Sequence, residues 1–201
     1  MVQKMEGQII ISISREFGSG GHDIAKKVAD DFGIKFYDRN MLDEIAVAKN
    51  TTADKLSAYD EKSESFFSKR FGSQAAETAV AKMQFNFIHK RAELGESFVV
   101  VGRCADVVLD DFDDIFKIFI MGNHREKLAR VMKKYKMNER NASALMEKTD
   151  KQRRAYHNRY APYKWGDSRA YQLCINSSPL GEVKTAEIIE DYIKSALNNG
   201  Q

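Results

Sequence analysis

The chain has 201 residues, of which 43% are hydrophobic and 30% charged, and its formal net charge is only +3. This composition fits one soluble domain with a sizeable core, and the small net charge gives no general signal for nucleic-acid or membrane binding. No run approaches the roughly 20 apolar residues of a membrane span, and the N-terminus does not look like a signal peptide, so we expect a cytoplasmic protein. Cys104 and Cys174 lie in apolar contexts that favour buried free thiols over a disulfide or a metal site.

Short apolar runs alternate with helical patterns along the chain. Strands are predicted at residues 8–13, 35–37, 98–101, 115–121 and 172–175. Helices are predicted at residues 22–32, 41–49, 77–94, 124–135, 142–160 and 183–197. This alternation predicts an α/β fold, with a parallel five-stranded sheet and helices on both faces. The long helical stretch between the second and third strands exceeds a plain crossover and predicts an inserted helical subdomain.

The segment Ser14–Asp23 joins the first strand to the first helix through a glycine-rich turn. Against the phosphate-loop pattern G-x-x-x-x-G-K-[ST], Gly20 matches the second glycine, but the first falls on Arg15, the lysine on Gly21 and the hydroxyl residue on His22. The motif match is weak. A helix start behind a glycine turn still favours an anion site, and Arg15 within the turn can donate a planar fork to phosphate oxygens.

Two further polar clusters follow predicted strands, at Asp38–Asn40 and Gly102–Asp106. Because the carboxyl ends of parallel strands meet at one edge of a sheet, we expect both clusters to join the glycine turn at one site. Asp38 and Asp106 are the acids best placed for that site, and Asp38 is a candidate to hold a nucleotide hydroxyl or a metal-bound water. Arg103 is expected on the binding edge, with a salt bridge to Asp106 or Asp110 as the alternative. The four histidines show no metal-ligand spacing, so no metal-binding residues are predicted.

The segment 148–169 is strongly basic and includes Arg153, Arg154 and Arg159. Arginines along one helix suit the clamping of a phosphoryl group during transfer. A solvated helix face is the ordinary alternative for such a charge run. Interleaved tyrosines and a tryptophan also permit single-stranded RNA binding, although confinement of the charge to one segment makes nucleic acid the weaker interpretation.

Several motifs spread over nearly the whole chain resemble those of the cytidylate kinase-like proteins, a branch of the P-loop nucleoside monophosphate kinases. The matching pieces are ISISREFGSGGHDIAKKVA, FYDRNMLDEIA, FVVVGRCADVVL, DKQRRAYHNRYAPYKWGD and YQLCINSSPLG. The resemblance implies a single P-loop kinase domain over residues 1–201. Its core would comprise residues 1–39, 93–139 and 166–201, with a nucleoside-monophosphate-binding insert at 40–92 and an arginine-bearing lid at 140–165.

The resemblance also implies roles for particular residues and the use of ATP with Mg²⁺. Backbone groups of Gly18, Ser19, Gly20, Gly21 and His22, with Asp23 beside them, would hold the donor phosphates. The acceptor would be a nucleoside monophosphate, CMP-like by resemblance, held by Asp38, Arg39, Arg103 and Asp106. The catalytic cations would be Arg15, Arg153, Arg154 and Arg159. Mg²⁺ would be held mostly by phosphates and water. A homo-oligomer is also possible.

The chain departs from this pattern at functionally important positions. Gly21 stands in place of the lysine, His22 in place of the magnesium-binding hydroxyl, and Cys104 where cytidylate kinases have an aspartate after G-R. Loss of the lysine removes charge stabilisation from the transition state unless Arg15 or a lid arginine supplies it. A non-catalytic nucleotide- or anion-binding regulatory protein on a degenerate kinase core therefore remains the alternative to a kinase.

Overall fold

The computed structural model describes residues 7–38, 41, 45, 73–113 and 115–199. Within these, a five-stranded sheet in the order β2-β3-β1-β4-β5 forms the centre of the molecule, and all its neighbouring strands are parallel. The strands are β1 (Ile10–Arg15), β2 (Lys35–Tyr37), β3 (Phe98–Val101), β4 (Ile115–Met121) and β5 (Leu173–Asn176). The predicted α/β fold with a parallel five-stranded sheet is thus confirmed.

β1 is the central strand and is longer toward the site than the sequence pattern predicts. Hydrophobicity alone ends the strand at Ile13, but Ser14 and Arg15 continue the ladder by pairing with Phe119 and Ile120 of β4. Arg15, predicted to lie within the turn, is therefore the last residue of β1. Its backbone is fixed by the sheet rather than by a loop.

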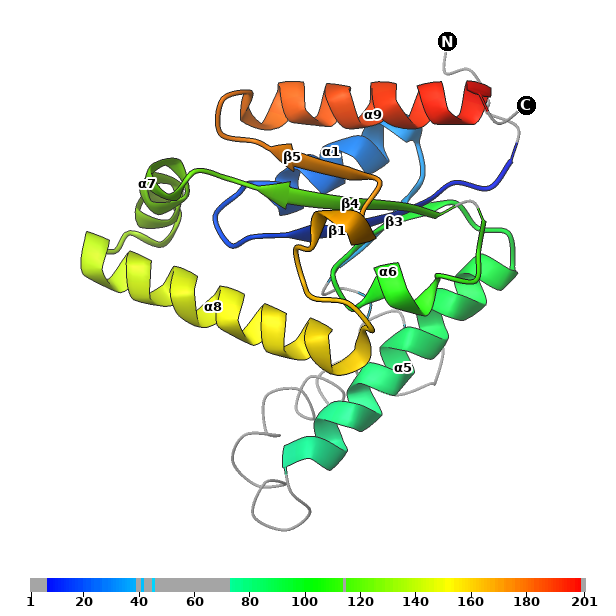
Figure 1. Cartoon of the computed structure of the whole chain (residues 1–201), viewed down its shortest axis with the longest axis horizontal. Helices are drawn as coiled ribbons and strands as arrows, with labels where there is room; N and C mark the ends of the chain where they lie inside the picture. Colours follow the sequence, from blue (N-terminus) through cyan, green and yellow to red (C-terminus); the bar gives the residue numbers. More distant parts are fainter. Residues whose placement is uncertain (1–6, 39–40, 42–44, 46–72, 114, 200–201) are drawn as a thin grey trace.

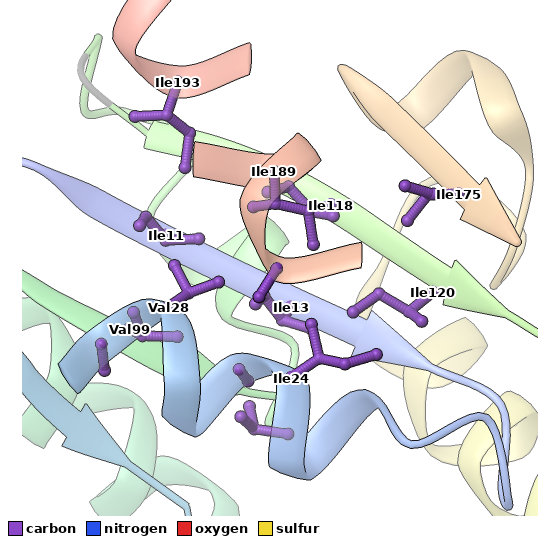
Figure 2. Close-up of a cluster of buried hydrophobic side chains, with 14 of the residues drawn as sticks. Ile11, Ile13, Ile24, Val28, Val99, Ile118, Ile120, Ile175, Ile189 and Ile193 are labelled. Atoms are coloured by element: carbon purple, nitrogen blue, oxygen red, sulfur yellow. The ribbon is translucent and has the colours of Figure 1, made fainter. Parts of the chain in front are cut away.

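One face of the sheet is covered by α1 (Gly21–Phe32) and the closing helix α9 (Gly181–Asn199), which run together in Figure 1. Ile11 and Ile13 of β1 pack there against Ile24 and Val28 of α1 (Figure 2). Ile189 and Ile193 of α9 complete the same cluster. Burying this many branched side chains between sheet and helices supplies the main driving force for folding and fixes the start of α1 beside the end of β1.

The other face carries α5 (Ser73–Glu93) and the short helix α6 (Ala105–Val108), which pack over β2, β3 and the start of β4. Beyond the strand ends lie α7 (His124–Tyr135) and the long helix α8 (Glu139–Tyr160) (Figure 1). A 3₁₀ turn at Ser168–Ala170 precedes β5. Helices therefore cover both faces, and α7 and α8 lie near the edge where the strands end.

Helix boundaries differ from the sequence prediction in one instructive place. The apolar pattern predicts that the helix before residue 160 starts at Ala142, but α8 begins at Glu139 because the side chain of Asn138 accepts a hydrogen bond from Asn141 N at 2.9 Å and caps the helix. The predicted helix 41–49 lies almost wholly outside the described residues. Both cysteines are free, and Cys104 is buried as predicted, whereas Cys174 is only partly buried.

Candidate active site

The loop between β1 and α1 is a tight glycine turn at the N-terminus of a helix. Gly18 and Gly20 adopt φ of 83° and 78°, and Gly20 directly precedes the first helical residue, Gly21. The N–H of Ser19 returns to the carbonyl of Glu16 at 3.3 Å. Positive φ at two positions explains why this turn is built from glycine. The helix start behind it offers unpaired amide groups and a positive dipole end, which together attract anions.

α7 supports this turn from behind. A Cβ on Gly18 would lie 2.9 Å from Val131 Cγ2, so α7 can approach only because residue 18 is glycine. Arg130 Nη1 donates to the carbonyl of Gly18 at 2.5 Å. The nearly buried Lys127 places its ammonium 2.8 Å from Glu16 Oε2. These contacts hold the loop in one shape, which is what a preorganised phosphate cradle requires.

The side chain of Arg15 runs across the position where the lysine of a phosphate loop would begin. A Cβ on Gly21 would lie 2.6 Å from Arg15 Cβ and 2.9 Å from its Cγ. Farther along, Arg15 Nη1 lies 2.5 Å from the Cβ position of Gly102, at the end of β3. Arg15 therefore extends from β1 over the start of α1 toward β3, and both glycines leave room for it. The usual pattern would have glycine at position 15 and lysine at position 21, whereas this chain has the cation at position 15 and glycine at position 21.

A cavity of about 880 Å³ opens over this arrangement. The sequence-predicted residues that line it are Arg15, Gly18, Gly20, Gly21, His22, Asp23, Asp38, Arg103, Arg153 and Arg159. They come from the ends of β1, β2 and β3, the first turn of α1 and the helix α8. The structure thus brings residues from each of the three predicted strand-end clusters, and the basic helix, to one site.

Arg103 reaches the cavity rather than the two carboxylates named as alternative partners. Asp110 pairs with Lys117, and Asp106 contacts His157. Among the described residues, no ion pair joins Arg103 to either acid. Arg103 has a φ of 60°, a left-handed conformation uncommon for residues other than glycine.

Asp106 is a correction to the sequence prediction, because it does not line the cavity. It is 1% exposed, and its Oδ2 lies 2.7 Å from His157 Nε2 and 3.0 Å from the hydroxyl of Tyr163. Burial raises the pKa of Tyr163, and the nearby charge of Asp106 raises it further. Asp106 therefore ties α6, which follows Arg103, to the C-terminal part of α8. It lies behind the cavity lining and supports the position of α8.

Two other predicted residues also lie off the cavity lining. Ser19 is fully buried, and its hydroxyl donates to the carbonyl of Glu16 at 2.9 Å, because the turn folds it inward. Arg154 points to Trp165, with its Cζ 5.7 Å from the ring centroid, because it faces away from its neighbour Arg153 on the helix. Arg39 lies outside the described residues.

Comparison with known proteins assigns the family. The model of the cytidylate kinase-like family matches residues 10–179, most of the chain. The chain belongs to the cytidylate kinase-like family.

Solved structures share the fold of this chain. An uncharacterized protein from Eubacterium ventriosum is 39% identical, with 94% of this chain and 99% of that chain covered and a TM-score of 0.75. A shikimate kinase from Bacteroides thetaiotaomicron is 12% identical, covers 92% and 98% of the two chains, and has a TM-score of 0.55. A shikimate kinase from Acinetobacter baumannii in complex with shikimate is 14% identical, with 95% and 96% covered and a TM-score of 0.54. The shikimate kinases establish the P-loop kinase fold alone. A search of curated proteins finds no match.

This family member also has site residues that the sequence pattern did not reveal. Arg130 and Lys134 of α7 line the cavity, as do Gln84 of α5 and Tyr156 of α8. Arg130 and Lys134 are four residues apart, so they share one face of α7. The sequence does show this basic pair at helical spacing. Only the three-dimensional arrangement shows that this face of α7 lies beside the phosphate loop.

The cavity lining is rich in cationic side chains. Among the described residues it holds six cationic side chains and three carboxylates, those of Glu16, Asp23 and Asp38. The cations are Arg15, Arg103, Arg130, Lys134, Arg153 and Arg159. Such an excess of positive charge at a helix N-terminus suits a ligand with several phosphate groups.

A metal would find few protein ligands here. No group of three or more His, Cys, Asp or Glu residues in the described part of the chain is arranged to hold a metal ion. Asp38 does line the cavity, and its Oδ2 lies 2.8 Å from His22 Nε2. These residues fit a hard cation that keeps phosphate and water ligands, with Asp38 as one carboxylate of the lining, rather than a site built by the protein alone.

α8 also contacts the phosphate loop directly. The N–H of Phe17 donates to Asp150 Oδ1 at 2.7 Å, and Arg153 Nη1 donates to the carbonyl of Arg15 at 3.0 Å. Burial raises the pKa of Asp150, and the Phe17 N–H partly offsets this. Asp150 thus places a carboxylate against one of the loop amides.

No helix in the described chain is long and apolar enough to cross a bilayer.

Proposed function

We propose that this protein transfers a phosphoryl group from ATP to a nucleoside monophosphate, CMP-like by family resemblance. The observation that supports this most is the cavity. It joins a helix-capped glycine turn to cations from β1, β3, α7 and α8 within one volume of about 880 Å³. Phosphoryl transfer depends on positioning two phosphates in line and on neutralising the charge between them, and these residues can do both.

The donor phosphates would bind at the glycine turn. Backbone N–H groups around Gly20 and the positive end of α1 would hold them, and Arg130 and Lys134 of α7 would add charge from the loop side. Arg103, at the end of β3, would bind the acceptor phosphate. Arg153 and Arg159, on α8, would approach the group in flight.

Arg15 would take over the task of the absent lysine. Its side chain crosses from the start of α1 toward Gly102, so it spans the donor loop and the acceptor side. A guanidinium there can donate to oxygens of two phosphates at once, which a single ammonium does less well. Its position supports a cation displaced from residue 21 to residue 15 rather than lost.

Mg²⁺ would enter with ATP, and Asp38 with His22 are the residues best placed to meet it or its bound water. When bound, the ion supplies charge neutralisation at the transferring phosphates. The protein's own part is to hold Asp38 in place through the 2.8 Å contact with His22. A cation held mainly by phosphate and water is consistent with the sparse carboxylates of the site.

A non-catalytic nucleotide- or anion-binding protein is the second candidate. Two observations favour it: residue 21 is glycine, and the carboxylate of Asp150 occupies the N–H of Phe17. Either feature weakens phosphate binding relative to an ordinary phosphate loop.

A coupled assay with ATP and Mg²⁺ against CMP, UMP, AMP, GMP and shikimate separates these candidates. We expect ADP formation that depends on one or more monophosphates. Binding of nucleotides without turnover across the panel would favour the non-catalytic reading. Turnover with shikimate alone would support kinase activity but would exclude a nucleoside monophosphate as the acceptor.

A further inference from the structure

Gln84 is a buried amide that has no hydrogen-bond partner among the described residues. It lies on α5 and is 1% exposed, and it belongs to the cavity lining. Within the described part of the chain, neither its Nε2 nor its Oε1 has a hydrogen-bond partner. Buried polar side chains nearly always have partners, so an amide with both ends unpaired needs an explanation.

Stability alone does not explain this residue. A leucine of similar size would bury the same volume without leaving a donor and an acceptor unpaired, which carries a free-energy penalty. The amide therefore weakens the ligand-free protein slightly. A ligand that enters the cavity and pairs with both ends would remove that penalty.

The surroundings of Gln84 indicate what kind of ligand group fits. Val80 and Ala81 lie one turn earlier on α5, are 3% and 2% exposed, and line the same cavity. Residues at this spacing share one helix face, so the wall is apolar except for a single carboxamide. The cationic side chains of the lining come instead from β1, α7, α8 and the segment just after β3. The cavity thus has a phosphate-binding region and, on α5, an uncharged region.

A nucleobase matches this wall. Its flat faces are apolar, and its edge presents a hydrogen-bond donor next to an acceptor, which a carboxamide can pair with in two bonds. A polyol acceptor would need several separate polar partners instead, and Val80 and Ala81 offer none.

We propose that Gln84, with Val80 and Ala81, forms the subsite that recognises the base of the acceptor nucleotide. This rests on the proposed function, because it takes the acceptor to be a nucleoside monophosphate. Arg103 then holds the phosphate end and Gln84 reads the base edge. Gln84 is a specificity-determining residue and takes no part in the chemical step.

The test compares a complete acceptor with one that lacks the base. Wild type, Gln84→Leu and the control Asn86→Leu are titrated calorimetrically with the preferred monophosphate and with ribose 5-phosphate, and their transfer kinetics are measured. Asn86 is an exposed amide on the same helix. We expect Gln84→Leu to weaken monophosphate binding about 10- to 100-fold. Ribose 5-phosphate binding should be unchanged, and the melting temperature equal or higher. Asn86→Leu should match wild type.

The outcomes separate this inference from the proposed function. If wild type binds monophosphates without transferring phosphate, the kinase proposal fails, yet a base-dependent loss in Gln84→Leu still supports the subsite. If wild type turns over and Gln84→Leu retains full affinity, or loses affinity equally for ribose 5-phosphate, the subsite is wrong and the kinase stands. No monophosphate binding by wild type overturns both.

Discussion

The exchange of glycine and cation between positions 15 and 21 predicts that the two residues are energetically coupled. Lysine at residue 21 would place its Cβ 2.6 Å from Arg15 Cβ, about 1 Å inside normal carbon contact. Overpacking of this kind destabilises a protein by about 1–3 kcal/mol. Gly21→Lys alone should therefore lower the free energy of unfolding by that amount. In the double variant Arg15→Gly/Gly21→Lys the clash is absent, so most of the loss should be recovered.

A double-mutant cycle measures this coupling. Urea unfolding of wild type, both single variants and the double variant, followed by far-UV circular dichroism, should give an interaction free energy of about 1–3 kcal/mol. ATP affinity should follow the same order, with the double variant binding better than either single variant. Additive effects of the two substitutions, or a Gly21→Lys protein as stable as wild type, would refute the claim that Arg15 occupies the space of the lysine.

Three further predictions concern contacts around the site. Asp106→Ala leaves the buried His157 and the Tyr163 hydroxyl without a hydrogen-bond partner and should lower the free energy of unfolding by about 1–3 kcal/mol. A loss within about 0.5 kcal/mol in urea unfolding would show that Asp106 does not tie α6 to α8. Because burial raises the pKa of Asp150 above 3.8, its carboxylate disfavours the folded state as the pH rises through the shifted pKa. In thermal melts from about pH 4 to about pH 7, the melting temperature of Asp150→Asn should therefore rise relative to that of wild type. A difference in melting temperature that stays constant over this range would contradict the prediction. Burial raises the pKa of the Cys104 thiol to about 12. In the native protein, iodoacetamide at about pH 8 should therefore label Cys174 before Cys104, and in guanidinium chloride it should label both thiols. Early labelling of Cys104 in the native protein would contradict its burial.

The sheet was predictable because each strand is a short buried run of branched residues. Phe98–Val101 and Ile115–Met121 have the predicted bounds for this reason. Where the residues are polar, hydrophobicity gives no signal: Ser14 and Arg15 belong to β1 only because β4 lies beside them. The order of the strands depends on tertiary packing, and no local pattern encodes it.

Residues of the cavity lining were predictable where a motif or a strand end marked them. Arg103 follows a buried strand and was found, whereas Lys134 lies on a charged helix that resembles any solvated face. Gln84 carries neither charge nor motif, and only its burial without partners reveals it. Asp106 was expected at the cavity but lies outside its lining, because a strand-end acid looks the same in sequence whether it faces a cavity or a histidine.

The role of Arg15 is tested most directly by the rate of phosphoryl transfer after its removal. Arg15→Ala is compared with wild type and with Arg140→Ala, an exposed arginine at the start of α8 outside the cavity lining. If Arg15 stabilises the transferring phosphoryl group, its removal should lower kcat about 100- to 1,000-fold in a protein that still folds, while Arg140→Ala keeps the wild-type rate. An Arg15→Ala protein with undiminished kcat would contradict the account.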